Sequence, residues 1–417
     1  MHKVLVVAYD YPPLAGAGII RTMKFTQHFK EFGWEPYILT VKNPDRFYTA
    51  EGKDPVPVGM KVYRSRNYLN NLSMVQGGLG KLGMRKKFIV PDVYAGWIFD
   101  TVRKAKILIR EEGIDLIYVS CPPYSGAVAG AWLKRTFPHI PLVVDFRDAW
   151  TVNPYTKRNY LSSRVQAIDD RLERWVFGQA DAVAVAADGI MREYVQKYPD
   201  HAAKMTVIYT GFDQNDIPLD ISPNNKFTIL YAGYFYGVQT PEPICQALSM
   251  IKAEGRISPD ELEFKWIGRR SPYESLIEKY GLRQYMKYWG VVPKSVADYE
   301  TAKADLFYLT IGQNAEVSQS YTLTNKIFSC LGAGKPILAT VPEGDAKSLI
   351  EQHSDNSYII TDYDPVKIKR AIETAYARRN ERWMVSEKTR RYRESFNHAA
   401  TVIQLTDIMD QLVIKNE

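Results

Sequence analysis

The sequence predicts an α/β fold of two Rossmann-like parallel-sheet domains that face a cleft. Short apolar runs alternate with amphipathic segments through the first half of the chain, and the pattern begins again after a polar, proline-containing stretch at 213–226. Strands separated by helices are typical of parallel crossover units with a covered sheet. At 417 residues the chain also exceeds one comfortable hydrophobic core, which favours two domains.

In the first half, compact apolar runs predict strands and longer amphipathic segments predict helices. The first helix is expected to end at Gly33, because glycine readily adopts the left-handed conformation that closes many helices. The predicted strands are 4–8, 36–40, 116–120, 142–145 and 180–186, and the predicted helices are 20–32, 98–112 and 188–197.

The second half repeats this alternation and ends in a long amphipathic helix, predicted at 396–413. The predicted domains are therefore 1–212 and 213–395, followed by a C-terminal helical segment at 396–417. The predicted strands are 227–232, 262–267, 305–309, 336–340 and 357–360, with helices between them.

Composition excludes several classes of protein. No run approaches the 18 apolar residues of a membrane-spanning helix, and the apolar fraction of 46% is ordinary for a globular protein. The three cysteines are odd in number and lack metal-ligand spacing, which favours a reducing, cytoplasmic compartment without a metal site. A net charge of +7 permits contact with phosphates but does not indicate nucleic acid.

The most informative segment is 320–342, which predicts a loop, a helix with Lys326 in its first turn, and a buried strand. A lysine at that position opposes the helix dipole, and a bound anion would resolve the conflict. Exposed N–H groups at the helix start also suit a diphosphate. Thr324 and Asn325 offer further donors, although both would equally serve as helix caps.

A second candidate is the loop at 10–21, between the first strand and the first helix. Gly16 and Gly18 would let the backbone approach a ligand closely, although a flexible turn fits the same pattern. Arg21 stands where the dinucleotide fingerprint has its third glycine, and no acidic residue ends the second strand at Thr40. Both departures disfavour an NAD-linked oxidoreductase.

Polar residues also follow the predicted strand at 142–145. Arg147 and Asp148 lie where sites collect in α/β sheets, and a carboxylate there can orient a hydroxyl or take its proton. An Arg–Asp pair that pins a loop is the simpler alternative.

Two later strand ends add further candidates. Gly233 would permit close approach of a ligand, while Tyr234 could stack on a ligand or lie half-buried on the turn. Arg269 or Arg270 could reach a phosphate, and a solvated pair of arginines is the alternative.

These segments together resemble glycosyltransferase family 4. Ser329 stands where the family has a glutamate that holds the ribose, and Ala127 stands near the point where one branch carries a histidine, so no catalytic histidine is assigned. The matching features are the loop Tyr-Pro-Pro-x-x-Gly-x-Gly-x-x-Arg at 11–21, the string Asp-Phe-Arg-Asp-x-Trp at 145–150, the element Tyr-Ala-Gly-x-Phe at 231–235, and Lys326, Phe328, Gly334, Lys335, Pro336 and Ile337.

The resemblance implies the GT-B fold and transfer of a sugar, with retention of configuration, from a nucleoside-diphosphate sugar to a hydroxyl of a glycan or lipid-linked acceptor. It implies no metal and no cofactor besides the donor, a role in envelope polysaccharide or glycolipid synthesis, and a C-terminal helix that packs back on the first domain. The implied acceptor-side or catalytic residues are Arg147, Asp148 and Lys326, and the implied donor-binding residues are Gly16, Gly18, Arg21, Gly233, Tyr234, Arg269, Thr324, Asn325 and Ser329.

Three further clusters of charged residues lie outside these segments. Lys81, Arg85, Lys86 and Lys87, mixed with apolar residues, suit the surface of an anionic membrane, and a solvated loop is the alternative. Asp362 and Asp364 have the spacing of a metal motif but precede Pro365, which favours a helix start. The adjacent pair 169–170 is expected on solvated surface.

A second functional class stays open at this point. Ser329 and the missing histidine would also fit a catalytically weak protein of the same fold that serves as a partner or scaffold in a glycan-assembly complex.

Overall fold

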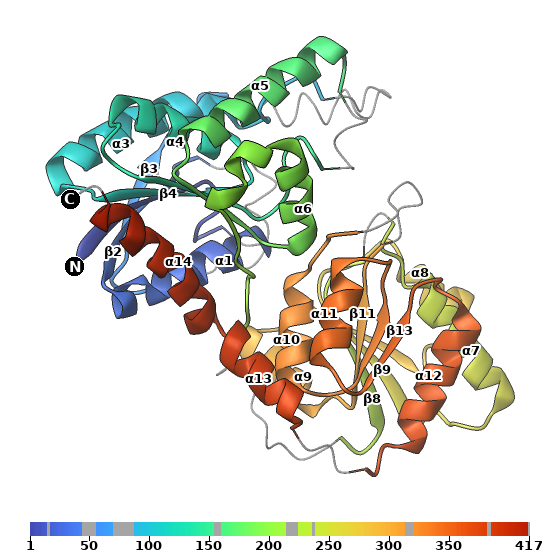
Figure 1. Ribbon diagram of the computed structural model, residues 1–417. Helices are drawn as coiled ribbons and strands as arrows, with labels where there is room; N and C mark the ends of the chain where they lie inside the picture. Colours follow the sequence, from blue (N-terminus) through green and yellow to red (C-terminus); the bar gives the residue numbers. More distant parts are fainter. Residues whose placement is uncertain are drawn as a thin grey trace. The chain divides into compact units, whose positions relative to one another are not determined.

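The computed structural model describes residues 1–14, 17–43, 56–69, 87–153, 160–213, 224–235, 238–312, 320–381 and 385–415. The chain divides into two compact units, Met1–Thr210 with His398–Glu417, and Gly211–Asn397. Each unit is built on its own parallel sheet, of seven strands in the first and six in the second (Figure 1). The predicted fold class of two parallel-sheet α/β domains is confirmed.

The first sheet has the strand order β3-β2-β1-β4-β5-β6-β7, with every pair parallel. Its central strands are buried on both faces, which explains their continuous apolar sequences. The strands are β1 (His2–Ala8), β2 (Trp34–Val41), β3 (Lys61–Ser65), β4 (Leu116–Cys121), β5 (Leu142–Phe146), β6 (Ala182–Val185) and β7 (Met205–Val207).

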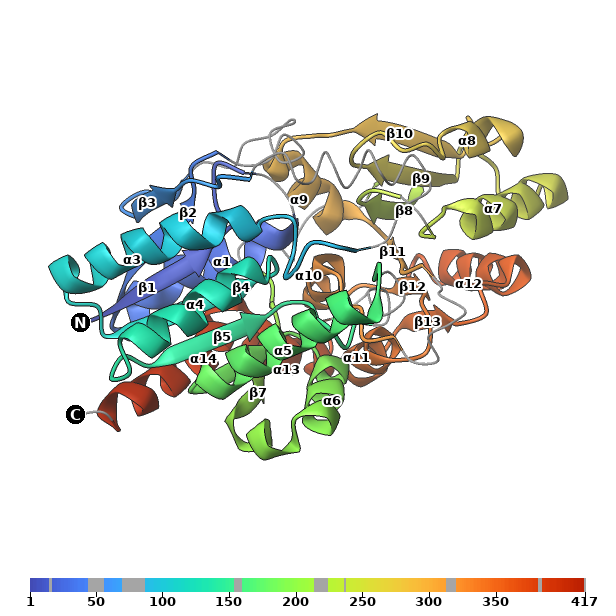
Figure 2. The same cartoon turned by 90° about the horizontal axis from the view of Figure 1, so that it is seen from above.

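Helices cover both faces of this sheet. Helices α3, α4 and α5 lie side by side on one face, and α1 and α14 lie on the other (Figures 1 and 2). Helix α14 buries Val402, Leu405 and Met409 completely, and Trp34 Nε1 donates a hydrogen bond of 2.8 Å to Asp410 Oδ1. The helices are α1 (Ala17–His28), η1 (Phe29–Phe32), η3 (Ala95–Trp97), α3 (Ile98–Glu112), α4 (Ser125–Thr136), α5 (Ser163–Gln179), α6 (Asp188–Lys197), η4 (Pro199–Lys204) and α14 (His398–Ile414).

The second sheet has the order β10-β9-β8-β11-β12-β13, again parallel throughout. Its strands are β8 (Phe227–Ala232), β9 (Leu262–Ile267), β10 (Met286–Gly290), β11 (Leu306–Thr310), β12 (Ile337–Thr340) and β13 (Ser357–Ile360). Its helices are α7 (Glu242–Glu254), α8 (Ser275–Lys279), α9 (Lys294–Lys303), α10 (Asn325–Ala333), α11 (Asp345–His353), α12 (Pro365–Ala377) and α13 (Glu387–Phe396).

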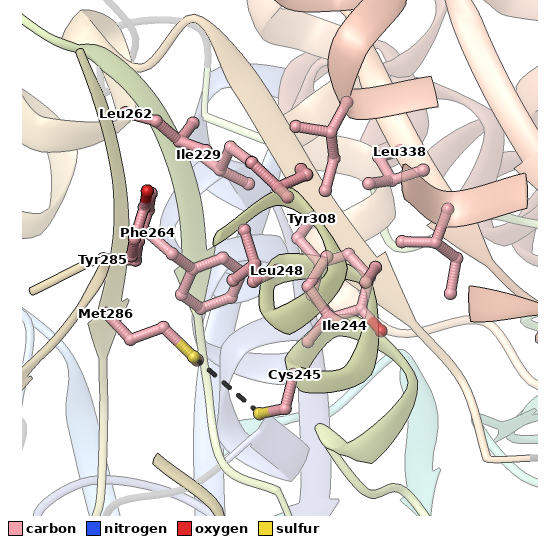
Figure 3. Packing of buried hydrophobic residues seen from close by; sticks show 14 of the residues in the cluster. Ile229, Ile244, Cys245, Leu248, Leu262, Phe264, Tyr285, Met286, Tyr308 and Leu338 are labelled. Carbon is pink, nitrogen blue, oxygen red and sulfur yellow. Dashed lines mark hydrogen bonds between the residues drawn. The ribbon is translucent and has the colours of Figure 1, made fainter. Parts of the chain in front are cut away.

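The core of the second unit lies between this sheet and helices α7 and α12. Ile244, Cys245 and Leu248 of α7 pack on Ile229 of β8 and Phe264 of β9 (Figure 3). Helices α10 and α11 cover the opposite face (Figure 1). This arrangement leaves the C-terminal ends of the strands to carry functional loops.

The predicted elements differ from the structure mainly at the sheet edges and at the C-terminal helix. Strands β3, β7 and β10 were not predicted. The predicted helix at 396–413 is the separate helix α14, which begins at His398 because Asn397 has an extended backbone with φ −66° and ψ 157°. The boundaries between the two units follow residues 210 and 397, compared with the predicted 212 and 395.

Candidate active site

Lys326 is the second residue of α10, and its ammonium group leans on strand β8. Nζ donates a hydrogen bond of 3.0 Å to the Tyr231 hydroxyl and lies 4.3 Å from the centroid of the Tyr231 ring. Among the described residues, no carboxylate pairs with this ammonium group. Burial lowers the pKa of Lys326 to about 8. A half-buried cation that no described carboxylate neutralises is suited to bind an anion.

Two glycines make room for this ammonium group. A Cβ atom on Gly233, which follows β8, would lie 2.0 Å from Lys326 Nζ. A Cβ atom on Gly268, which follows the neighbouring strand β9, would lie 2.1 Å from the Gly233 carbonyl oxygen. The two strand ends therefore pack backbone against backbone, and only glycine fits at either position.

The position in the sheet matches this chemistry. The order of the strands reverses between β8 and β11, because β9 and β10 are added on one side of β8 and the later strands on the other. Helix α10 follows β11 in the sequence. Ligands of open α/β sheets bind at the carboxyl ends of the strands at such a reversal. Helix α10 begins there without a side-chain cap at Thr324, whose buried hydroxyl has no hydrogen-bond partner among the described residues.

The other donor-side predictions surround this point. Arg269 follows Gly268 and is exposed, whereas Arg270 forms an ion pair of 3.3 Å with Glu274. The Tyr234 side chain is 38% exposed on the turn after Gly233. Asn325 and Ser329 are half-buried on α10, one turn apart. The structure thus places the predicted residues of the second unit in the loops that follow β8 and β9 and at the start of α10.

In the first unit, Gly18 packs against protein rather than leaving an open space. A Cβ atom there would lie 2.6 Å from Arg147 Nη1 and 2.8 Å from Asp10 Oδ2. Arg147 donates to the Gly18 and Pro122 carbonyl oxygens and pairs with Asp10 at 3.2 Å. Burial raises the pKa of Asp10, although Arg147 opposes this shift. Gly16 lies outside the described residues.

Arg21 has a different surrounding from the one predicted. Its side chain is 2% exposed and forms two hydrogen bonds, of 2.8 and 2.9 Å, with the carboxylate of Asp145. Asp145 also accepts a hydrogen bond of 2.6 Å from the Tyr118 hydroxyl. Because this ion pair ties α1 to β5 inside the first unit, the geometry argues against the predicted contact between Arg21 and a donor.

The two predicted residues after β5 point in different directions. Arg147 is directed inward, and its backbone N–H donates 2.8 Å to the Cys121 carbonyl oxygen. Asp148 is exposed, whereas the next residues, Ala149 and Trp150, are buried. The loop therefore presents a single carboxylate at the carboxyl end of the first sheet.

Residues 20–216 match the sequence model of Glycosyltransferase Family 4. The first unit therefore carries a Glycosyltransferase Family 4-like sequence, and the two-sheet architecture is that of the GT-B fold. No curated protein sequence matches the chain at a significant level.

Solved structures with the GT-B fold are similar along the whole length. Sucrose-phosphate synthase from Thermosynechococcus elongatus gives a TM-score of 0.71 at 15% identity, with 100% of both chains covered. HepE of Anabaena, solved with UDP and glucose, gives 0.62 at 17% identity and covers 98% of this chain and 100% of its own. WaaG, a glycosyltransferase involved in lipopolysaccharide biosynthesis, gives 0.63 at 15% identity, with 97% and 99% covered. At these identities the likeness shows the fold alone.

Sequence reasoning missed three residues of this family 4-like site. Tyr231 is the second-last residue of β8 and lies two positions before Gly233, so its closeness to the predicted glycine was a usable signal. Gly268 follows β9 as Gly233 follows β8, and this parallel placement was a second signal. Asp10 follows β1, but nothing local in the sequence indicated that it would pair with Arg147.

The structure also shows the surroundings of several residues from the three charged clusters of the sequence. Lys81, Arg85 and Lys86 lie outside the described residues, whereas Lys87 Nζ pairs at 2.5 Å with Asp169, a carboxylate with no exposure. The expectation that Asp169 is solvated is therefore wrong. Asp364 caps α12 by accepting a hydrogen bond of 2.8 Å from the Val366 N–H. Within the described parts of the chain, no helix has the length and apolar character needed to span a membrane.

Proposed function

We propose that this protein is a retaining glycosyltransferase that moves a sugar from a nucleoside-diphosphate sugar to a hydroxyl of a glycan or lipid-linked acceptor. The observation that supports this most is the ammonium group of Lys326, held at the reversal point of the second sheet by Tyr231 and by the space above Gly233. A diphosphate is the anion that the sugar donors of this fold family carry, and its negative charge complements the ammonium group of the half-buried Lys326.

The proposed chemistry follows from charge development. When the sugar leaves, negative charge grows on the terminal phosphate of the donor, and fixed positive groups stabilise that charge most in the transition state. Lys326 is mostly protonated at pH 7 because its pKa is about 8. The start of α10 and the exposed Arg269 add positive potential, so the proposed reaction needs no resident metal.

The proposed acceptor side lies on the first unit. The exposed Asp148 carboxylate would accept a hydrogen bond from the acceptor hydroxyl and orient it. Arg147 would hold the loop in place through Asp10 and two carbonyl oxygens rather than contact the acceptor freely.

We propose a cytoplasmic enzyme of envelope polysaccharide or glycolipid synthesis. The lipopolysaccharide role printed for WaaG supports a similar acceptor class. Contact with anionic lipid would rest on Lys81, Arg85 and Lys86, because Lys87 is already neutralised by Asp169. Neutralising those three residues is expected to weaken co-sedimentation with anionic vesicles, and unchanged binding would dispose of the membrane contact.

A scaffold without appreciable activity is the second candidate. Ser329 supports it, because a serine cannot replace the two acceptor oxygens of a glutamate that holds a ribose. The loss of such a charged hydrogen bond costs on the order of 1–3 kcal/mol of donor binding unless another group substitutes.

A panel of nucleoside diphosphates and their sugars separates the two candidates. For a transferase, one nucleoside diphosphate should raise the melting temperature. At a hundredfold excess over its Kd, this ligand should add about 2.7 kcal/mol to the free energy of unfolding. The matching nucleotide sugar should be consumed by transfer or slow hydrolysis. A protein stabilised by none of them and inert toward every sugar would be a scaffold.

A further inference from the structure

The loop that follows β5 is held by a ring stack and several hydrogen bonds. Trp150 stacks on Tyr124 with ring centroids 4.9 Å apart and planes inclined by 4°. The Tyr124 hydroxyl donates 2.7 Å to the Ala149 carbonyl oxygen, and the Tyr194 hydroxyl accepts 2.8 Å from the Trp150 N–H. Asp148 is the exposed exception within this braced stretch.

Two carboxylates of α5 complete the bracing from behind. Asp169 accepts 3.0 Å from Trp150 Nε1 and 2.6 Å from the Tyr160 hydroxyl, in addition to its ion pair with Lys87. Its acceptor oxygens therefore join three separate segments of the chain.

Glu173 lies one helical turn further on the same face. It accepts 2.9 Å from the Thr151 N–H and 2.6 Å from the Thr151 hydroxyl. The Tyr198 hydroxyl at 2.8 Å and Lys197 Nζ at 2.6 Å complete its shell. Both carboxylates have no exposure, so neither contacts solvent directly.

Stability alone gives a weak reason for this pair. Buried ion pairs often contribute no more than apolar residues of similar volume, because desolvation offsets the attraction. The backbone N–H of Thr151 and the indole N–H of Trp150 donate directional hydrogen bonds to these carboxylates. Such bonds fix the position and orientation of the loop more closely than apolar packing does. Asp148 is the exposed residue of this loop, and these hydrogen bonds fix its position.

We propose that Asp169 and Glu173 are positioning residues that hold Asp148 in the place required for the acceptor hydroxyl. This inference rests on the proposed function of Asp148. Neither carboxylate contacts substrate; each acts through Trp150 or Thr151. A misplacement of about 1 Å is known to reduce turnover by roughly a hundredfold in oriented reactions.

Amide hydrogen exchange of the full chain tests the bracing directly. The variants are Asp169→Asn and Glu173→Gln, and Asp200→Asn serves as the control because Asp200 is exposed on η4 and takes part in none of the hydrogen bonds given above for Asp169 and Glu173. Exchange over 147–153 should accelerate at least tenfold more than the measured loss of global stability explains, and the control should match the wild type. Equal acceleration throughout the first unit would reduce the carboxylates to a structural role.

A milder variant keeps the test valid if a charge-removing variant fails to fold. Trp150→Phe removes the indole N–H that donates to Asp169, together with part of the buried ring, and keeps an aromatic ring against Tyr124, so it should loosen the same loop. Unchanged exchange over 147–153 in this folded variant would overturn the proposal.

Kinetics separate positioning from donor binding. With the nucleotide sugar selected by the panel, the positioning variants should lose kcat by about a hundredfold while the Kd for the nucleoside diphosphate stays at the wild-type value. Asp148→Asn should lose kcat with wild-type exchange. Full turnover in Asp148→Asn would refute the proposed role of Asp148, while the exchange data would still decide whether α5 braces the loop.

Discussion

At the scale of single residues, Lys326 combines a folding cost with the binding role that we propose for it. Its pKa is lower in the folded chain than the ordinary value of 10.5, so the charged form is disfavoured by folding. The residue therefore weakens stability below pH 8, and this penalty disappears as the pH rises from about 8 toward 10.5. A bound diphosphate would remove the penalty by supplying the missing counter-charge.

This linkage predicts proton uptake on binding. At pH 8 about half of the Lys326 amines are neutral, and a diphosphate should raise the pKa and protonate them. Calorimetry in buffers of different ionisation enthalpy should report uptake of about half a proton per nucleoside diphosphate bound. Lys326→Met should abolish this uptake. If the wild type takes up no proton, Lys326 does not meet the phosphates.

Gly233→Ala tests the space that the ammonium group occupies. The added methyl group would lie 2.0 Å from Nζ and must displace it from Tyr231. We expect nucleoside-diphosphate affinity to fall at least tenfold, as measured by titration. Gly178→Ala is the control, because its Cβ atom would meet nothing within 4 Å. Equal affinity in both variants would mean that the observed position of Lys326 is not the binding position.

Arg21→Met distinguishes a structural role from donor contact. Removing the guanidinium leaves the Asp145 carboxylate buried with only Tyr118, which should cost about 3–5 kcal/mol of unfolding free energy in a denaturant titration. The double variant Arg21→Met/Asp145→Leu should recover part of that loss. Unchanged stability with weakened nucleotide binding would restore the donor role.

At the scale of elements, α14 closes the first unit although it comes last in the sequence. Leu405 has no exposure, whereas Ile403 on the same helix is 41% exposed. Leu405→Ala should destabilise the first unit by about 2–5 kcal/mol, and Ile403→Ala should change stability little. Thermal unfolding monitored separately for the two units checks this; equal effects of the two variants would mean that α14 does not cover the sheet.

The elements that sequence reasoning predicted and missed differ in burial. Strands β8 and β9 match their predicted bounds, because β8 is mostly apolar and β9 is an alternation of apolar residues with Glu263 and Lys265 in which every position is buried. Strands β3, β7 and β10 lie at sheet edges and mix buried with exposed positions, so they lack such a stretch. Only their neighbours in the folded sheet define them as strands.

The site shows the same division between local and long-range information. Lys326 and Gly233 stand out locally, through a cation in a first helical turn and a glycine after a strand. The ion pair of Arg21 with Asp145 and the burial of Asp169 depend on partners 124 and 82 residues away in the sequence. A charged residue reads the same in a sequence whether it meets solvent or a buried partner.

At the scale of the whole molecule, two parallel sheets with the same kind of reversal in strand order present different charged groups. In the first, the reversal lies between β1 and β4, near Asp10 and Arg147; in the second, it lies between β8 and β11, near Tyr231 and Lys326. The first unit presents a carboxylate and the second presents a cation. This division matches an acceptor hydroxyl on one unit and a diphosphate on the other.

Titration of nucleoside diphosphates at pH 7 into the wild type and Lys326→Met tests the central claim most directly. Lys252→Met is the matched control, because Lys252 is on the surface and, among the described residues, its ammonium group donates to the Gly281 carbonyl oxygen alone. Losing a charged hydrogen bond worth about 1.5–3 kcal/mol should weaken binding by roughly tenfold to a hundredfold in Lys326→Met alone. Wild-type affinity in Lys326→Met would contradict the account.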